Sequence, residues 1–135
     1  MPLIEWNQSY SVKVPTLDEQ HAGLIQILNE LHQAMLEGKG TQAMAVILCR
    51  LGVYARQHLQ TEEQMLEKYG YPKYAEHKAQ HDAYVAKIHT YEDKLCAGEA
   101  AFSVELLNFL KQWWTSHIMT TDKQYSEFLH QKGAS

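Results

Sequence analysis

The stretch HLQTEEQMLEKYGYPKYAEHKAQH, residues 58–81, sets metal-binding side chain types on both sides of a single turn. His58 and Glu62 lie four residues apart before the turn, and His77 and His81 lie four residues apart after it. Residues four apart on an α-helix are rotated by only about 40° and project from one face. Glycine and proline between the two pairs are typical of a helix end. The stretch therefore predicts two consecutive helices that each carry a pair of potential metal ligands.

Apolar residues at steps of three and four extend this pattern to the rest of the chain. We expect helices at about residues 17–37, 41–68, 72–96 and 102–122. The first opens with Thr16-Leu17-Asp18-Glu19, which is typical of a capping box. No stretch shows convincing alternation of apolar and polar residues, so we predict no strands. Four helices with short connections favour antiparallel neighbours, and hence an all-α, up-down-up-down four-helix bundle.

The length of 135 residues indicates one domain, 1–135, with enough chain for one core. We expect residues 1–15, which include Trp6 and Tyr10, to form an extended N-terminal arm packed on the bundle, and residues 123–135 to form a C-terminal tail. Two cysteines, Cys49 and Cys96, are too few for a disulfide framework, and we expect both to be buried or half-buried thiols.

Charge and hydropathy exclude some classes of partner. The chain has 12 basic and 16 acidic residues, a formal charge of −4, and no basic cluster that would follow a phosphate backbone. We therefore expect no nucleic-acid partner. The sequence shows no signal peptide and no apolar run of about 18 residues, so we predict no membrane span and a soluble, cytoplasmic protein. We also expect a monomer.

The predicted topology gathers potential metal ligands at one end of the molecule. In an up-down-up-down bundle the starts of the first and third helices lie beside the ends of the second and fourth. The sequence places ligand-type residues at all four of these positions, on the stripes that also carry apolar residues. They are His21, His58, Glu62, His77, His81, His117 and Asp122.

Seven such groups in an apolar bundle end require a compensating cation. A single buried histidine is explained by a hydrogen bond to a carbonyl, but two carboxylates and five imidazoles without a cation would carry a large desolvation cost. The set exceeds the needs of one tetrahedral zinc ion and suits two divalent first-row ions bridged by the carboxylates. With one shared hydroxide or oxide, three imidazoles complete six-coordination on one ion. The remaining two imidazoles leave an open position on the other.

These residues, in this order, resemble the hemerythrins, most closely the single-domain bacterial ones. The resemblance runs from Trp6 to Tyr125 and rests on a set of motifs that is specific as a whole, although each motif alone is weak. The motifs are Asp18-x-Gln20-His21, His58-x-x-x-Glu62-Glu63, Tyr71-Pro72 before His77-x-x-x-His81, and His117-x-x-x-x-Asp122.

The resemblance implies two iron ions per chain, joined by a bridging oxide or hydroxide, and reversible binding of dioxygen. By motif position, one iron would be held by three histidines and the other by two, with both carboxylates as bridges. The three are His77, His81 and His117, the two are His21 and His58, and the bridges are Glu62 and Asp122. A non-enzymatic oxygen carrier, store or delivery protein is expected, with an oxygen-consuming enzyme as recipient. The alternatives are an enzyme that reacts with oxygen, nitric oxide or peroxide, and an oxygen or iron sensor.

Two features do not fit a regular pattern. His117 and Asp122 are five residues apart, which rotates them by about 140° on an α-helix, so we predict a local π-type widening or a helix end between them. Trp114 stands where the family usually carries a leucine in the oxygen pocket, and we expect it either to narrow ligand access or to turn outward. Trp113 and Tyr54 are also candidates for the pocket wall, and Glu63 is expected to be a solvated surface charge.

Overall fold

The computed structural model describes residues 3–38, 41–96 and 103–135, and over these ranges all regular structure is helical. The long helices are α1 (Pro15–Leu36), α2 (Thr41–Lys68), α3 (Tyr74–Cys96), α4 (Ser103–Ser116) and α5 (Lys123–Gln131). A short 3₁₀ helix, η1 (Gln8–Tyr10), precedes them, and a π-helical segment, η2 (His117–Asp122), joins α4 to α5. None of the described helices is both long and apolar enough to cross a membrane.

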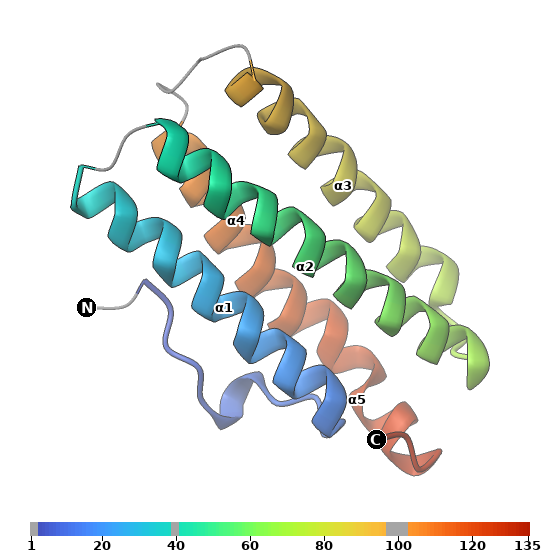
Figure 1. The fold of residues 1–135 in the computed structure, drawn as a ribbon. Coiled ribbons are helices and arrows are strands. Elements are labelled where there is room, and N and C mark those ends of the chain that lie inside the picture. The colour runs from blue at the N-terminus through green and yellow to red at the C-terminus, as the bar shows by residue number, and fades with distance from the viewer. Residues whose placement is uncertain (1–2, 39–40, 97–102) are drawn as a thin grey trace.

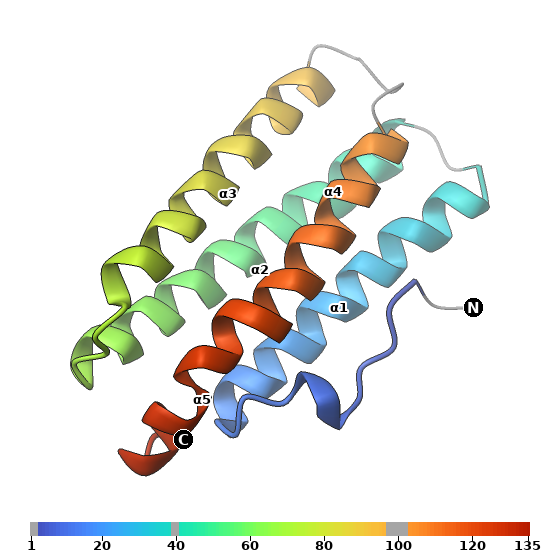
Figure 2. The same ribbon diagram turned by 180° about the vertical axis from the view of Figure 1, so that it is seen from behind.

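Helices α1 to α4 lie alongside one another and alternate in direction, which confirms the predicted four-helix bundle (Figures 1 and 2). The α2–α3 turn shows how the sequence sets this topology. Gly70 follows the last turn of α2 with a φ of +73°, and the amide of Tyr71 donates to the carbonyl of Leu66 at 2.9 Å. This left-handed glycine satisfies the free carbonyls of the helix end and reverses the chain.

The start of α1 differs from the capping box that the sequence indicates. The helix begins at Pro15, whose missing amide hydrogen suits the first helical position, and no side chain caps it. The predicted box fails because its residues are engaged elsewhere. Thr16 donates its hydroxyl hydrogen to the carbonyl of Ser135, and the Asp18 carboxylate accepts hydrogen bonds from the Ser11 hydroxyl and the Val12 amide.

Residues Lys123–Gln131 are helical, although the apolar pattern predicts that the fourth helix ends at about residue 122 and that residues 123–135 form a tail. The π-helical segment η2 has more residues per turn than an α-helix, so it changes the helical register. The apolar residues after it therefore no longer follow the α-helical spacing of the residues before it. In the new register Tyr125 and Leu129 of α5 are fully buried. Helix α5 also contacts the N-terminal arm, since the Ser126 hydroxyl donates to the Val12 carbonyl at 2.7 Å.

Two apolar clusters fill the bundle. The main cluster includes Leu24 of α1, Ala55 and Leu59 of α2, and Trp114 of α4. The second cluster closes the other end and combines the arm, the bundle and α5. Its buried members are Val12, Val14, Leu17, Leu66, Tyr71, Tyr125, Leu129 and Ala134. The arm and α5 together therefore seal one end of the bundle, where the arm runs into the start of α1 close to α5 (Figure 1).

One expectation about the cysteines is wrong. Cys49 is an exposed thiol on α2, because it falls on the outer face of the helix, next to the buried Leu48. The side chain of Cys96 lies outside the described residues.

The contact between α1 and α2 depends on Gly23. A methyl group there would overlap the hydroxyl of Tyr54, which donates to the Gln20 carbonyl at 2.9 Å. We expect Gly23→Ala to destabilise the metal-free protein by about 1–3 kcal/mol, because the tyrosine must move and lose this hydrogen bond. The free energy of unfolding in denaturant measures the effect.

Gly52 of α2 provides a matched control. A methyl group on Gly52 would meet the tip of the flexible Arg56 side chain at 3.0 Å. Gly52→Ala should therefore be neutral or stabilise the protein by up to about 1 kcal/mol, through helix propensity. Equal effects of the two substitutions would contradict this account of the α1–α2 contact.

Candidate metal centre

The seven ligand-type residues are buried between the two apolar clusters. On α1, His21 lies one turn after Leu17 of the second cluster and just before Leu24 of the main cluster. On α2, Glu62 lies between Leu59 and Leu66 in the same way. None of the seven residues exceeds 4% exposure: His21, His58, Glu62, His77, His81, His117 and Asp122. The structure therefore brings together all seven ligand-type residues that the sequence singles out.

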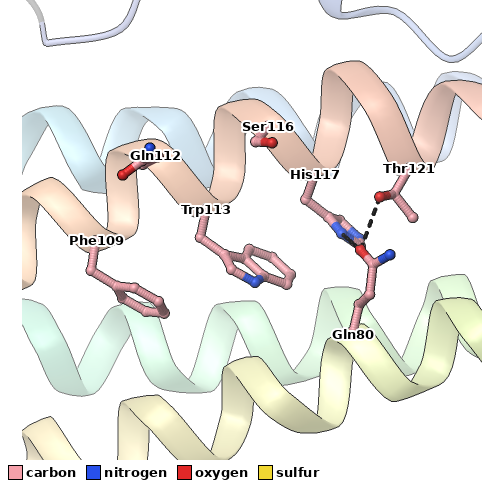
Figure 3. Close-up of a pocket in the computed structure, with 7 residues that line it drawn as sticks. All are labelled: Gln80, Phe109, Gln112, Trp113, Ser116, His117 and Thr121. Carbon is pink, nitrogen blue, oxygen red and sulfur yellow. Dashed lines mark hydrogen bonds between the residues drawn. The ribbon is translucent and has the colours of Figure 1, made fainter.

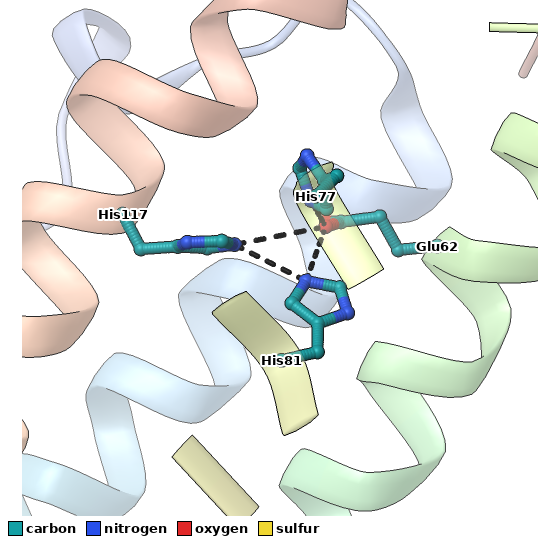
Figure 4. Close-up of side chains that lie close together, drawn as sticks. All are labelled: Glu62, His77, His81 and His117. Atoms are coloured by element: carbon teal, nitrogen blue, oxygen red, sulfur yellow. Dashed lines mark hydrogen bonds and ion pairs between the residues drawn. The ribbon is translucent and has the colours of Figure 1, made fainter. Parts of the chain in front are cut away.

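The carboxylate of Glu62 turns one oxygen to each of two groups of imidazoles. Its Oε1 atom contacts Nε2 of His77 and lies 3.1 Å from Nε2 of His81 and 3.9 Å from Nε2 of His117 (Figure 4). Its Oε2 atom lies 3.3 Å from Nε2 of His58 and 3.6 Å from Nε2 of His21. All five imidazoles thus direct the same ring nitrogen at one carboxylate.

Asp122, at the end of η2, also turns one oxygen to each group of imidazoles. Its Oδ1 atom lies 3.0 Å from Nε2 of His117 and 3.2 Å from Nε2 of His77, while its Oδ2 atom lies 3.1 Å from Nε2 of His21. The ligand atoms of two sets converge to within 4.8 Å of one another. One set is Glu62, His77, His81 and His117, and the other is His21, His58, Glu62 and Asp122.

The π-helical segment is what brings Asp122 into the site. It begins at His117 and ends at Asp122, which confirms the widening predicted from their spacing of five residues. Regular α-helical winding would rotate the two side chains apart by about 140°. The wider turn aligns them, and both are buried with Oδ1 of Asp122 next to Nε2 of His117.

Three of the imidazoles are oriented by hydrogen bonds to their other nitrogen. Nδ1 of His58 lies 2.7 Å from Oε1 of Gln20, and Nδ1 of His117 lies 3.0 Å from Oε1 of Gln80. Nδ1 of His81 lies 2.8 Å from Oε2 of Glu63. Because these oxygens are acceptors, Nδ1 carries the proton, and the lone pair of Nε2 points into the site.

The sequence did not reveal these hydrogen-bond partners of the histidines. The expectation that Glu63 is a solvated surface charge is wrong, because its carboxylate binds His81. Each partner is the sequence neighbour of a ligand-type residue: Gln20 of His21, Glu63 of Glu62 and Gln80 of His81. A neighbour is rotated by about 100°, which points it toward the adjacent helix and a histidine there. Adjacency to a ligand is therefore the signal that finds such residues.

Tyr125 is a further residue that the sequence did not reveal. It is fully buried, and its hydroxyl donates to Oε2 of Glu62 at 2.9 Å. Burial, followed by the charges of Asp122 and Glu62, raises the pKa of Tyr125 well above its ordinary value. The phenol therefore keeps its proton and fixes the carboxylate.

The three candidates for the pocket wall lie in different places. The ring of Trp113 stacks on His117, with centroids 4.3 Å apart and planes 13° apart. Trp114 is fully buried, 5.9 Å from the ring of His58, so the alternative of an outward indole is wrong. Tyr54 is bonded to the carbonyl of Gln20 and is half-buried.

When no metal is bound, protonated histidines balance the negative charges of the two buried carboxylates. Burial lowers the pKa of His21 and of His77, but the nearby carboxylates of Asp122 and Glu62 outweigh it and raise both pKa values to about 9. Burial also raises the pKa of Glu62 and of Asp122, yet the surrounding histidines bring both below their ordinary values. Protons on imidazoles thus compensate the two buried carboxylates.

The donor set fits a pair of metal ions better than it fits these protons. Several buried donor and acceptor atoms have no hydrogen-bond partner among the described residues, including both oxygens of Asp122 and Nε2 of His21 and of His58. Nε2 of His81 also faces Nε2 of His117 at 3.2 Å, where two lone pairs would repel unless a proton or a cation lies between them. Divalent first-row ions are commonly bound by imidazole nitrogens and carboxylate oxygens.

Comparison with known proteins agrees with this geometry. The model of the hemerythrin HHE cation binding domain matches residues 12–129. The chain belongs to the hemerythrin family.

Similar members of the hemerythrin family are found among both sequences and solved structures. The bacteriohemerythrin of Methylococcus capsulatus is 31% identical, over 96% of this chain and 98% of that protein. The bacteriohemerythrin of Stenotrophomonas maltophilia is 30% identical, over 94% of this chain and 82% of that protein. The crystal structure of a wild-type hemerythrin matches with a TM-score of 0.88 at 30% identity and covers 94% of this chain and 98% of its own.

The raised pKa values predict how the stability of the metal-free protein depends on pH. A histidine with a folded pKa of about 9 and an ordinary value of 6.5 stabilises the fold below pH 6.5, and this contribution is lost as the pH rises through 9. The free energy of unfolding should therefore fall between about pH 7 and pH 9.5, by an amount on the order of a few kcal/mol.

Denaturant titrations of two variants separate this effect from other ionisations. His77→Gln should reduce the slope, because it removes one of the groups whose pKa is raised in the folded protein. His130→Gln changes an exposed histidine of α5 outside the site and should keep the wild-type slope. A wild-type slope in both variants would contradict the assignment of the buried protons.

Proposed function

We propose that this protein binds dioxygen reversibly at a di-iron centre held by the seven buried side chains. The supporting observation is that both carboxylates offer one oxygen to each set of imidazoles, as two bridging ligands would. One set, His77, His81 and His117, would hold one iron, and the other, His21 and His58, would hold the second. Glu62 and Asp122, with an oxide or hydroxide, would be the bridges.

The unequal number of imidazoles supports gas binding. Two ferrous ions would supply one open coordination position, on the side with two histidines, and the electrons that dioxygen needs to bind. The protein side chains hold these groups away from water, because apolar clusters close the site on both sides. Gln20 fixes the ring of His58 at the open side, so the ligand set is held before dioxygen arrives.

The surroundings of the carboxylates favour reversible binding over oxygen activation. Cleavage of an oxygen–oxygen bond requires delivered protons as well as electrons. The Tyr125 hydroxyl donates a hydrogen bond to the Glu62 carboxylate and could in principle deliver a proton. The raised pKa of Tyr125 keeps this proton on the phenol. A monomeric, cytoplasmic carrier that delivers dioxygen to an oxygen-consuming enzyme is our prediction for its cellular role.

Anaerobic loading with ferrous iron, followed by cycles of oxygenation and removal of oxygen, tests the proposal. We expect two irons per chain and a visible charge-transfer band that appears with dioxygen and disappears without it. A single conversion to a ferric form on first contact, with release of peroxide, would instead support an oxidase or peroxidase.

The buried position of Trp114 predicts that its indole slows the access of small ligands to the centre. Its indole is fully buried, lies 5.9 Å from His58 on the side of the proposed open position, and donates to the Tyr84 hydroxyl at 3.1 Å. We expect Trp114→Leu to increase the rates of dioxygen and azide binding by about tenfold or more, because it opens space in a close-packed region. Stopped-flow absorbance on the iron-loaded protein measures both rates.

Tyr84→Phe is the matched control for this substitution. It removes the hydrogen bond of the indole but retains its volume. If access depends on volume, Tyr84→Phe should leave the rates close to wild type. Wild-type rates in Trp114→Leu would contradict a role for the indole in ligand access.

A further inference from the structure

A groove between α3 and α4 reaches the candidate metal centre from the surface. It has a volume of about 310 Å³, which is within the size range of small-molecule sites. Of the seven ligand-type residues, His117 lines it, and Phe109, Trp113 and Gln80 form its walls (Figure 3). The proposed open position is on the other set of histidines, so this groove is not the dioxygen site.

The lining of the groove is aromatic and uncharged. Besides Phe109, Trp113 and His117, it consists of neutral polar residues: Gln80, Gln112, Ser116 and Thr121. Gln112 and Ser116 are exposed where they line the groove, so the amide and the hydroxyl are accessible to a ligand. Such a lining suits a flat, uncharged aromatic molecule with polar groups at its edge.

Tryptophan rings connect this groove to both sets of imidazoles. Trp113 stacks on His117 with ring centroids 4.3 Å apart. It also contacts Trp114 at 4.8 Å, and Trp114 in turn lies 5.9 Å from His58. Trp114 is fully buried, whereas Trp113 is half-buried and borders the groove. The paths from the two sides of the centre therefore meet at the ring that borders the groove.

We propose that the groove is an electron-entry site, where a small uncharged aromatic reductant of the dihydroflavin class binds and reduces the oxidised centre through Trp113 and His117. This inference rests on the proposed function, since a carrier that has oxidised to the diferric state no longer binds dioxygen. The donor loses two electrons and two protons, each ferric ion gains one electron, and the protons pass to solvent at the open groove.

Binding is tested first on the metal-free protein, with riboflavin as the probe. We expect riboflavin fluorescence to be quenched in a saturable manner by contact with the indole. Ser116→Trp, which fills the groove, should abolish this binding, and Trp113→Leu should weaken it by about tenfold through loss of an aromatic contact. Asn108→Trp adds the same ring at an exposed position of α4 outside the groove, and it should bind like wild type.

Reduction is tested next on the diferric protein, in the absence of oxygen. Dihydroriboflavin should reduce wild type and Asn108→Trp at equal rates, and Ser116→Trp at least about tenfold more slowly. Dithionite is a small inorganic donor that does not need an aromatic site, and it should reduce all three at similar rates. Iron content and the ferric absorption spectrum establish that each variant retains an intact centre.

The outcomes separate this inference from the proposed function. Absence of saturable riboflavin binding, or equal reduction of Ser116→Trp and wild type by dihydroriboflavin, would overturn the electron-entry site and leave reversible oxygenation untouched. Failure to assemble two irons would overturn the proposed function, whereas riboflavin binding to the metal-free groove would still be measurable.

Discussion

Two carboxylates buried inside an apolar bundle are the constraint on which the rest of this structure depends. Glu62 and Asp122 are completely inaccessible to solvent, and an uncompensated charge in such a place is very costly. Compensation comes from the five imidazoles, whose Nε2 atoms surround the carboxylates, either as carriers of protons or as partners in holding metal ions. The raised pKa values of His21 and His77 correspond to the protonated, metal-free state. The buried Asp122 oxygens and histidine nitrogens that have no hydrogen-bond partner suit the metal-bound state.

The rest of the fold positions these groups and keeps water away from them. The arm and α5 close one side of the site with the second apolar cluster, and the main cluster closes the other. Gln20, Glu63 and Gln80 fix the rings of three histidines from outside. A site held in this way would need little rearrangement to take up metal.

Much of the centre is readable from the sequence because its geometry is local. Residues four apart on a helix share a face, so the sequence alone indicates the pairs His58–Glu62 and His77–His81. The bundle topology then places the remaining ligand-type residues at the same end. Even the π-helical segment follows from the five-residue spacing of His117 and Asp122. The spacing is incompatible with an α-helix that presents both side chains inward.

The features that the sequence did not reveal depend on contacts between distant segments. Glu63 looks like a surface charge until α3 places His81 beside it. The capping box at Thr16 fails because Asp18 binds the arm and Thr16 binds the C-terminus. Helix α5 escaped detection because the π-helical segment shifts the period that identifies it. In each case a tertiary partner outweighs the local pattern.

The central claim is that the two carboxylates lie between two metal ions. Anomalous diffraction at the iron absorption edge, from crystals of protein loaded with ferrous iron, tests it directly. The account predicts two iron peaks between Glu62 and Asp122, one beside His77, His81 and His117 and the other beside His21 and His58. A single peak at the site, or iron bound elsewhere in the molecule, would contradict it.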